Sequence, residues 1–194
     1  MSAELLTIFV SALLINNFTL TYFLGLCAFF GVSNRLETAF RLGLANIFVL
    51  VITSASAWAL ERFVLVHAPY LRLLAYIVCI ASTVQFVEMV LKKLAPALFR
   101  ALGIYLPLIT TNCAILALAL FQTSRGYGLA QGLTFAVGAG AGLTLALVLM
   151  AGLREEAELS NVPAMLRGTA ISFLLAGTLS LAFMGFAGLL SGGG

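Results

Sequence analysis

The feature that most constrains this chain is a series of long apolar segments that recurs from one end to the other. Each is about 20 residues or longer, the length that a helix needs to cross a hydrocarbon core of about 30 Å. Only 9% of the residues are charged and 62% are hydrophobic, whereas soluble domains carry about a quarter charged residues. The segments are rich in Leu and Ala and lack a period-two alternation, which favours helices over a barrel. The sequence therefore predicts an all-α integral membrane protein.

Six apolar segments can be delimited as predicted transmembrane helices. They cover residues 4–31, 39–60, 71–91, 101–122, 127–152 and 168–190. Neither a positively charged leader nor a small-residue cleavage site marks the first segment as a signal peptide, so we expect it to be retained. Residues 1–190 then form one multi-pass membrane domain, and residues 191–194 are expected to be a flexible tail.

The basic residues predict the orientation of these helices. Seven of the ten Lys and Arg residues lie at the first, third and fifth connections: Arg35, Arg41, Lys92, Lys93, Arg100, Arg154 and Arg167. The other three, Arg62, Arg72 and Arg125, lie at the second and fourth connections. Positive charge accumulates on the cytoplasmic side, so both termini are predicted on the periplasmic side. Topology alone explains the net charge of +3, and no nucleic-acid partner is expected.

Similar polar residues recur in the first and fourth segments. They are Asn16, Asn17 and Cys27 in the first segment and Thr110, Thr111, Asn112 and Cys113 in the fourth. Two plainer apolar segments follow each, so the chain is interpreted as two three-helix units, about residues 1–93 and 98–190. Because three is odd, the second unit must enter the membrane in the opposite orientation. This is the inverted repeat of many transport proteins.

The first and fourth segments are also predicted to be discontinuous. A straight helix over residues 4–31 would be about 42 Å long, well beyond what a bilayer needs. The fourth segment contains Gly103 and Pro107. We expect breaks near Asn16-Asn17, Gly25 and Pro107, because non-helical backbone at membrane depth needs polar partners or a buried setting.

The three cysteines allow more than one interpretation. Cys79 has only apolar neighbours and is expected to be a small core residue. Cys27 and Cys113 are either two further core residues, a membrane-buried disulfide of an unusual kind, or part of a metal site. Without a C-x-x-C pair the chain cannot build a complete site. A [2Fe–2S] cluster needs four ligands, so a homologous partner could supply the other two.

Other polar residues have simpler interpretations. Glu88 precedes Lys92 by four residues, which fits a helical ion pair, with a place on an ion path as the alternative. His67 is expected to be solvated. The run Arg154–Glu158 is predicted to be a solvated loop or a docking face for a soluble partner. The chain contains no Asp, so a Ser-His-Asp triad is excluded.

Small residues in the fifth segment predict close helix packing. Gly138, Gly140 and Gly142 alternate with small side chains, and small residues let helix backbones approach closely in membranes. No strand precedes them, which argues against a phosphate-binding loop.

Three stretches carry a resemblance to a known family. They are Leu14-Ile-Asn-Asn-Phe-Thr-Leu-Thr-Tyr-Phe-Leu-Gly-Leu-Cys-Ala-Phe-Phe-Gly-Val-Ser33, Gly103-Ile-Tyr-Leu-Pro-Leu-Ile-Thr-Thr-Asn-Cys-Ala-Ile-Leu116 and Val87-Glu-Met-Val-Leu-Lys-Lys93. They closely resemble segments of the RnfA/NqrE family of membrane subunits, and the resemblance extends over essentially residues 1–190.

The resemblance implies a cofactor and partners. Family members have six spans in two inverted halves and pair with a homologous six-span subunit, RnfE or NqrD. The pair holds a [2Fe–2S] cluster within the membrane, with two cysteines from each partner, and these match Cys27 and Cys113 here. Asn16, Asn17, Thr111 and Asn112 would line the broken helix ends beside it.

The resemblance also implies the activity. The complex, with subunits of the B, C, D and G types, lies in the bacterial inner membrane. It moves electrons between ferredoxin and NAD and couples this transfer to Na⁺ or H⁺ translocation. The chain would be a non-autonomous subunit of that enzyme. Its architecture alone equally fits a secondary transporter that binds a solute or ion at broken helices, and a structural scaffold is a third interpretation.

Overall fold

The computed structural model describes residues 2–32, 35–65, 69–94, 109, 111–159 and 168–187, and every regular element within these ranges is a helix. The helices are α1 (Ser2–Val10), the π-helix η1 (Ser11–Ile15), α2 (Leu26–Val32), α3 (Leu36–Leu60), the π-helix η2 (Glu61–Leu65), the 3₁₀-helix η3 (Pro69–Leu71), α4 (Arg72–Leu94), α7 (Cys113–Ser124), α8 (Leu129–Leu159) and α9 (Thr169–Ala187). The expectations for His67, Gly103, Pro107 and residues 191–194 lie outside the described residues. The predicted all-α class is confirmed for the described part.

Three of the described helices are long and apolar enough to cross a membrane. They are Leu36–Phe63, Arg72–Val90 and Leu129–Ala157, which match the second, third and fifth predicted segments. Ala3–Ile15, Cys113–Ser124 and Thr169–Gly185 are shorter apolar helices. They match parts of the other three segments.

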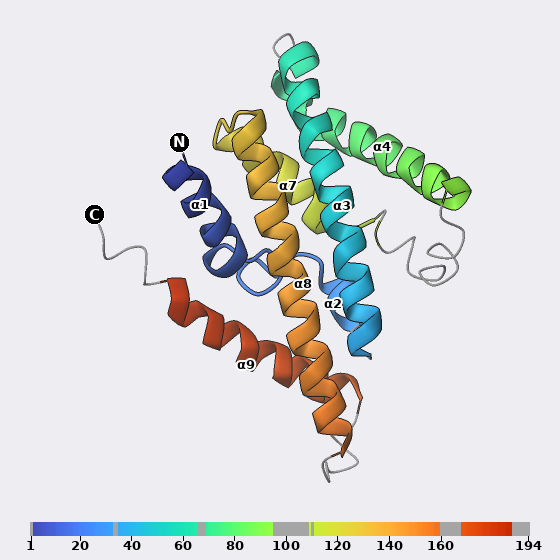
Figure 1. Ribbon diagram of the computed structural model, residues 1–194, viewed down its shortest axis with the longest axis vertical. Helices are drawn as coiled ribbons and strands as arrows, with labels where there is room; N and C mark the ends of the chain where they lie inside the picture. The colour runs from blue at the N-terminus through green and yellow to red at the C-terminus, as the bar shows by residue number, and fades with distance from the viewer. Residues whose placement is uncertain are drawn as a thin grey trace.

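Helices α3 and α8 form the centre of the molecule, where they lie side by side and run in opposite directions (Figure 1). Glycines allow this approach. A Cβ at Gly140 of α8 would lie 2.8 Å from Cγ1 of Ile47 in α3, and a Cβ at Gly43 of α3 would clash with Thr144 of α8. Close packing through small residues is therefore confirmed at this pair.

A second face of α8 packs against the N-terminal helices. A Cβ at Gly138 would lie 2.9 Å from the carbonyl oxygen of Phe9, and one at Gly142 would lie 2.8 Å from that of Leu13. Gly138 and Gly142 are one helical turn apart and so share this face. The glycines at 138, 140 and 142 thus allow close packing with two neighbours, because α8 lies between α3 and η1.

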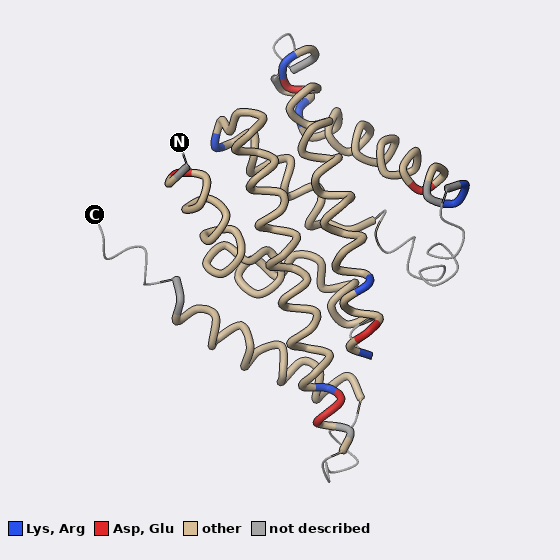
Figure 2. The backbone as a smooth tube through the Cα atoms, in the orientation of Figure 1, with Lys and Arg blue, Asp and Glu red and all other residues tan. Residues whose placement is uncertain are grey.

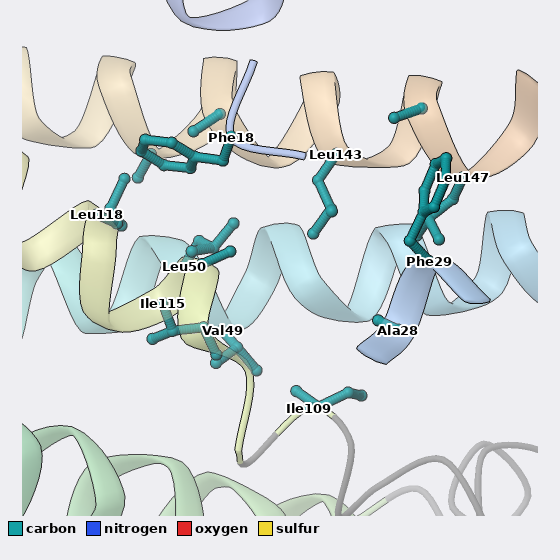
Figure 3. Packing of buried hydrophobic residues seen from close by; sticks show 14 of the residues in the cluster. Phe18, Ala28, Phe29, Val49, Leu50, Ile109, Ile115, Leu118, Leu143 and Leu147 are labelled. Atoms are coloured by element: carbon teal, nitrogen blue, oxygen red, sulfur yellow. The ribbon is translucent and has the colours of Figure 1, made fainter. Parts of the chain in front are cut away.

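The apolar core lies where α3, α7 and α8 meet the non-helical residues 16–25 and helix α2. Figure 3 shows Leu50, Leu118, Leu143 and Leu147 between these elements, together with Phe18 and Phe29. By contrast, α4 and α9 diverge from the central pair and expose large apolar side chains. Such side chains suit contact with lipid or with another protein.

The charged residues gather near the ends of the helices (Figure 2). Arg62 follows α3, Arg72 begins α4 and Arg125 follows α7, and these helix ends lie at one end of the molecule. Arg35 and Arg41 lie at the start of α3, and Arg154 lies near the end of α8, toward the opposite end. The middle of the central pair is therefore free of Lys, Arg, Asp and Glu, as a membrane-crossing pair requires.

Candidate functional site

The first apolar segment is broken in its middle. Helix α1 continues as η1 to Ile15, residues 16–25 are not helical, and α2 begins at Leu26. Phe23 and Gly25 close the break with positive φ angles of 55° and 81°, a region that glycine tolerates and phenylalanine rarely adopts. The break predicted at Asn16-Asn17 and Gly25 is confirmed.

In the described part of the fourth segment, helix α7 begins at Cys113. Asn112 is the N-cap of α7, and its side-chain oxygen accepts a hydrogen bond from the Ala114 N–H at 3.1 Å. An N-cap side chain of this kind satisfies a backbone donor that lacks an intrahelical partner. Residues 101–108 and 110 lie outside the described residues, so the break predicted at Pro107 stays a prediction.

Asn17 ties the break to α8. The side chain is fully buried, and its Nδ2 donates to the Gly142 carbonyl at 2.8 Å and to the Leu13 carbonyl at 3.4 Å. Its Oδ1 accepts from the backbone N–H groups of Thr19 and Leu20. One side chain therefore supplies the polar partners that non-helical backbone needs away from water.

Asn16 has a more local role. Its Nδ2 donates to Ser11 Oγ at 2.8 Å, and its Oδ1 accepts from the Tyr22 hydroxyl at 3.3 Å. Both partners belong to the same segment, at the start of η1 and within the break. Asn16 is half-buried, and through these two bonds it links the start of η1 to the non-helical residues of the break without contacting α8.

We expect Asn17→Ala to lower the free energy of unfolding by at least about 2 kcal/mol, because it leaves several buried backbone groups without partners. Asn16→Ala is the matched control, and its partners are nearer the surface, so we expect a loss of about 1 kcal/mol or less. Thermal unfolding of the detergent-solubilised protein measures both. Equal losses in the two variants would contradict this ranking.

The structure brings the end of the first break, just before Cys27, into contact with Cys113. Cys27 is the second residue of α2 and Cys113 is the first residue of α7, and both are exposed. The Gly25 N–H donates to Cys113 Sγ at 2.9 Å, and Gly25 lies two residues before Cys27. Cys79 lies within α4, is half-buried and begins no helix.

This setting fits a thiolate ligand. A backbone N–H directed at sulfur stabilises its negative charge, and the start of the 12-residue helix α7 adds the positive end of a helix dipole. Among the described residues, no three His, Cys, Asp or Glu side chains form a metal-binding group. Within that part of the chain Cys27 and Cys113 are therefore not joined by a third side chain of these kinds.

A buried amide that sequence reasoning missed supports the start of α7. Asn46 of α3 is fully buried, and its Oδ1 accepts from Asn112 Nδ2 at 3.4 Å. Asn112 also packs on the other break, where a Cβ at Gly25 would lie 3.2 Å from Asn112 Oδ1. The signal was available, because an amide within the apolar run of α3 is as unusual as Asn16-Asn17.

Further polar contacts link the C-terminal part of α7 to α3 and to α4. Ser54 Oγ donates to Gln122 Oε1 at 2.8 Å, and Gln122 Nε2 donates to the Ser54 carbonyl at 3.2 Å. The hydroxyl groups of Tyr76 in α4 and Thr123 in α7 also share a hydrogen bond. These neutral pairs fix the register of α7 against its neighbours in a setting with little competing water.

The remaining predicted site residues are less closely tied to this arrangement. Thr111 is exposed and lies immediately before the N-cap. Glu88 is half-buried on α4, a helix that carries neither Cys27 nor Cys113. Its predicted ion pair with Lys92 and its place on an ion path stay predictions.

The comparisons with known proteins cover nearly the whole chain. The family described as "Rnf-Nqr subunit, membrane protein" matches residues 5–190. The A-type subunit of the ion-translocating oxidoreductase complex of Syntrophotalea carbinolica is 53% identical over 191 residues, which cover 97% of this chain and 99% of that protein. The A-type subunits of Azoarcus sp. and Serratia proteamaculans are 51% and 50% identical, over 96% of this chain and 98% and 97% of their own lengths. The chain therefore belongs to the Rnf-Nqr family of membrane subunits.

Proposed function

We propose that this chain is a membrane subunit of a redox-driven, ion-translocating complex of the Rnf type. In that complex Cys27 and Cys113 would supply two of the four ligands of an intramembrane [2Fe–2S] cluster. The other two would come from a homologous six-span subunit of the RnfE kind. The relatives are named as subunits of an ion-translocating oxidoreductase complex, which supports the redox role. The observation that most directly supports the proposed cluster ligands is the hydrogen bond from the Gly25 N–H to Cys113 Sγ.

The exposure of the first break supports a protein partner. Thr21, Tyr22 and Phe23 are exposed at the break, in the middle of an apolar segment. Lipid cannot satisfy non-helical backbone at membrane depth, so such backbone must be covered by protein or line a polar cavity. A partner protein on this surface would cover both the break and the two exposed thiols.

The helix arrangement supports six spans in two inverted units. Helices α3 and α8 are the second helices of the two proposed units, and they run in opposite directions side by side. Helices α2 and α7 each carry a cysteine in their first turn. The basic residues then favour both termini on the periplasmic side of the bacterial inner membrane.

Each residue has a separate task in this proposal. The two thiolates would bind iron, and Asn17 and Asn112 would hold the backbone segments that carry them. The bound cluster would accept and release one electron at a time. The chain would thus relay electrons between ferredoxin and NAD through carriers in the other subunits, coupled to movement of Na⁺ or H⁺. Alone it would catalyse nothing, because half of the ligands are elsewhere.

The contents of iron and acid-labile sulfide distinguish this proposal from a secondary transporter. The complex is purified from membranes through a tag on this chain, and the subunit that stays bound after mild dissociation of the others is retained. We expect equal amounts of iron and sulfide, two of each per pair, and an EPR signal on reduction. A pair that contains neither element would exclude the cluster and favour a secondary transporter or a scaffold.

A further inference from the structure

Arg154 links the short helix that carries Cys27 to two other helices. It lies in α8, within the run that sequence analysis assigned to a solvated loop or docking face. The structure corrects the loop assignment, since α8 continues to Leu159 and Arg154 is half-buried. Its Nη1 donates to the Phe30 carbonyl in α2 at 3.1 Å. Its Nε and Nη2 donate to Ser172 Oγ in α9 at 3.0 and 2.7 Å.

The position of Cys27 depends on the tertiary contacts of α2. Helix α2 has only seven residues, too few to be stable without tertiary contacts. Ala28 and Phe29 are buried and hold its inner side, whereas Cys27 is exposed. A shift of α2 would therefore move the thiol directly.

Arg154 holds the other end of this helix. The Phe30 carbonyl is among the last four of α2, which have no partner within the helix. A guanidinium at this end satisfies the carbonyl and complements the negative end of the helix dipole. Charge-assisted hydrogen bonds of this kind are stronger than neutral ones.

In α9 the partner of Arg154, Ser172, is itself held in place. Ser172 is 1% exposed and donates to the Gly168 carbonyl at 3.1 Å, so its oxygen is held where the guanidinium meets it. The adjacent Phe173 ring packs on Phe30 with 4.6 Å between ring centroids. The C-terminal end of α2 thus contacts α9 through an aromatic pair and, through Arg154, a buried hydroxyl.

We propose that Arg154 is a positioning residue for Cys27. It fixes the end of α2 against α9 and so sets the geometry of the thiolate on the cluster. The inference rests on the proposed function, because it concerns how one of the proposed ligands is held. Outer contacts that orient a metal ligand alter metal affinity or activity by about 10–100-fold when they are removed.

The test uses the complete complex with Arg154→Gln, Arg154→Lys and Ser172→Ala. In Arg154→Gln we expect the cluster to be retained, its EPR spectrum and midpoint potential to shift, and electron transfer to slow about tenfold. Ser172→Ala should shift the spectrum in the same direction by less. Arg154→Lys keeps the charge but cannot donate to both partners in the same way, so we expect partial recovery.

Arg41→Gln is the matched control, because Arg41 is exposed and pairs with Glu37 on its own helix at 2.6 Å. Spectra and potentials equal to wild type in all three test variants would overturn the inference, as would an equal shift in Arg41→Gln. Should Arg154→Gln fail to assemble, Ser172→Ala decides: an altered spectrum supports the role, and an unaltered one overturns it. A wild-type complex without the cluster would instead refute the proposed function itself.

Discussion

Cys27→Ala and Cys113→Ala are each expected to abolish the EPR signal of the proposed intramembrane cluster in the purified complex and to stop electron transfer through it. Each change removes one thiolate from a set of four, and alanine offers no replacement ligand. Iron and acid-labile sulfide should fall by two atoms each per complex relative to wild type. The loss should be complete, because a [2Fe–2S] cluster needs four protein ligands and the changed complex offers only three.

Cys79→Ala provides the control for this experiment. Cys79 is half-buried within α4 and is expected to act as a small apolar side chain. We expect iron content, the EPR signal and turnover to match those of wild type. If signal and turnover survive in both Cys27→Ala and Cys113→Ala, the assignment of the ligands is wrong.

Gly142→Leu is expected to prevent assembly of the protein. Even a Cβ at this position would lie 2.8 Å from the Leu13 carbonyl oxygen and 3.2 Å from that of Ala12. These are backbone atoms that cannot rotate away, so η1 would have to separate from α8. The same separation would break the bond from Asn17 Nδ2 to the Gly142 carbonyl. We expect little or no assembled complex on size-exclusion chromatography of the solubilised membranes.

A graded series makes this prediction quantitative. Gly142→Ala adds only the Cβ, and overpacking of this kind costs about 1–3 kcal/mol, which should lower the midpoint of thermal unfolding without preventing assembly. Gly152 is the control within the same helix, since no neighbouring element of the described residues comes within 4 Å of a Cβ placed there. Gly152→Leu should assemble normally. Equal yields of Gly142→Leu and Gly152→Leu would show that the close contact with η1 is not required.

The sequence predicted those features that depend on residue type and local spacing. Asn16-Asn17 and Gly25 marked the first break because amides and glycine have few other roles within a long apolar run. Glycines at 138, 140 and 142 marked a close helix contact for a similar reason. In each case the residue type carried the information, and its partner did not need to be known.

Features that depend on distant partners were not predicted. Asn46 meets Asn112 across 66 residues, and Arg154 meets Phe30 across 124 residues. Local pattern does not reveal which helices pack together, so the contact of Asn46 with Asn112 could not be predicted, although its amide is unusual in an apolar run, and Arg154 was assigned to a loop or docking face. No local sequence pattern predicts the positive φ of Phe23, because tertiary contacts must hold an aromatic residue in that conformation.

The two glycine faces of α8 also restrict how the length of this helix can change. Adding or deleting one residue turns everything beyond it by about 100° around the helix axis. Such a change between Gly138 and Gly142 would direct side chains onto η1 on one side and onto Ile47 on the other. Insertions and deletions should therefore be tolerated in the connections and not in this stretch, which acts as a fixed spacer between α3 and η1.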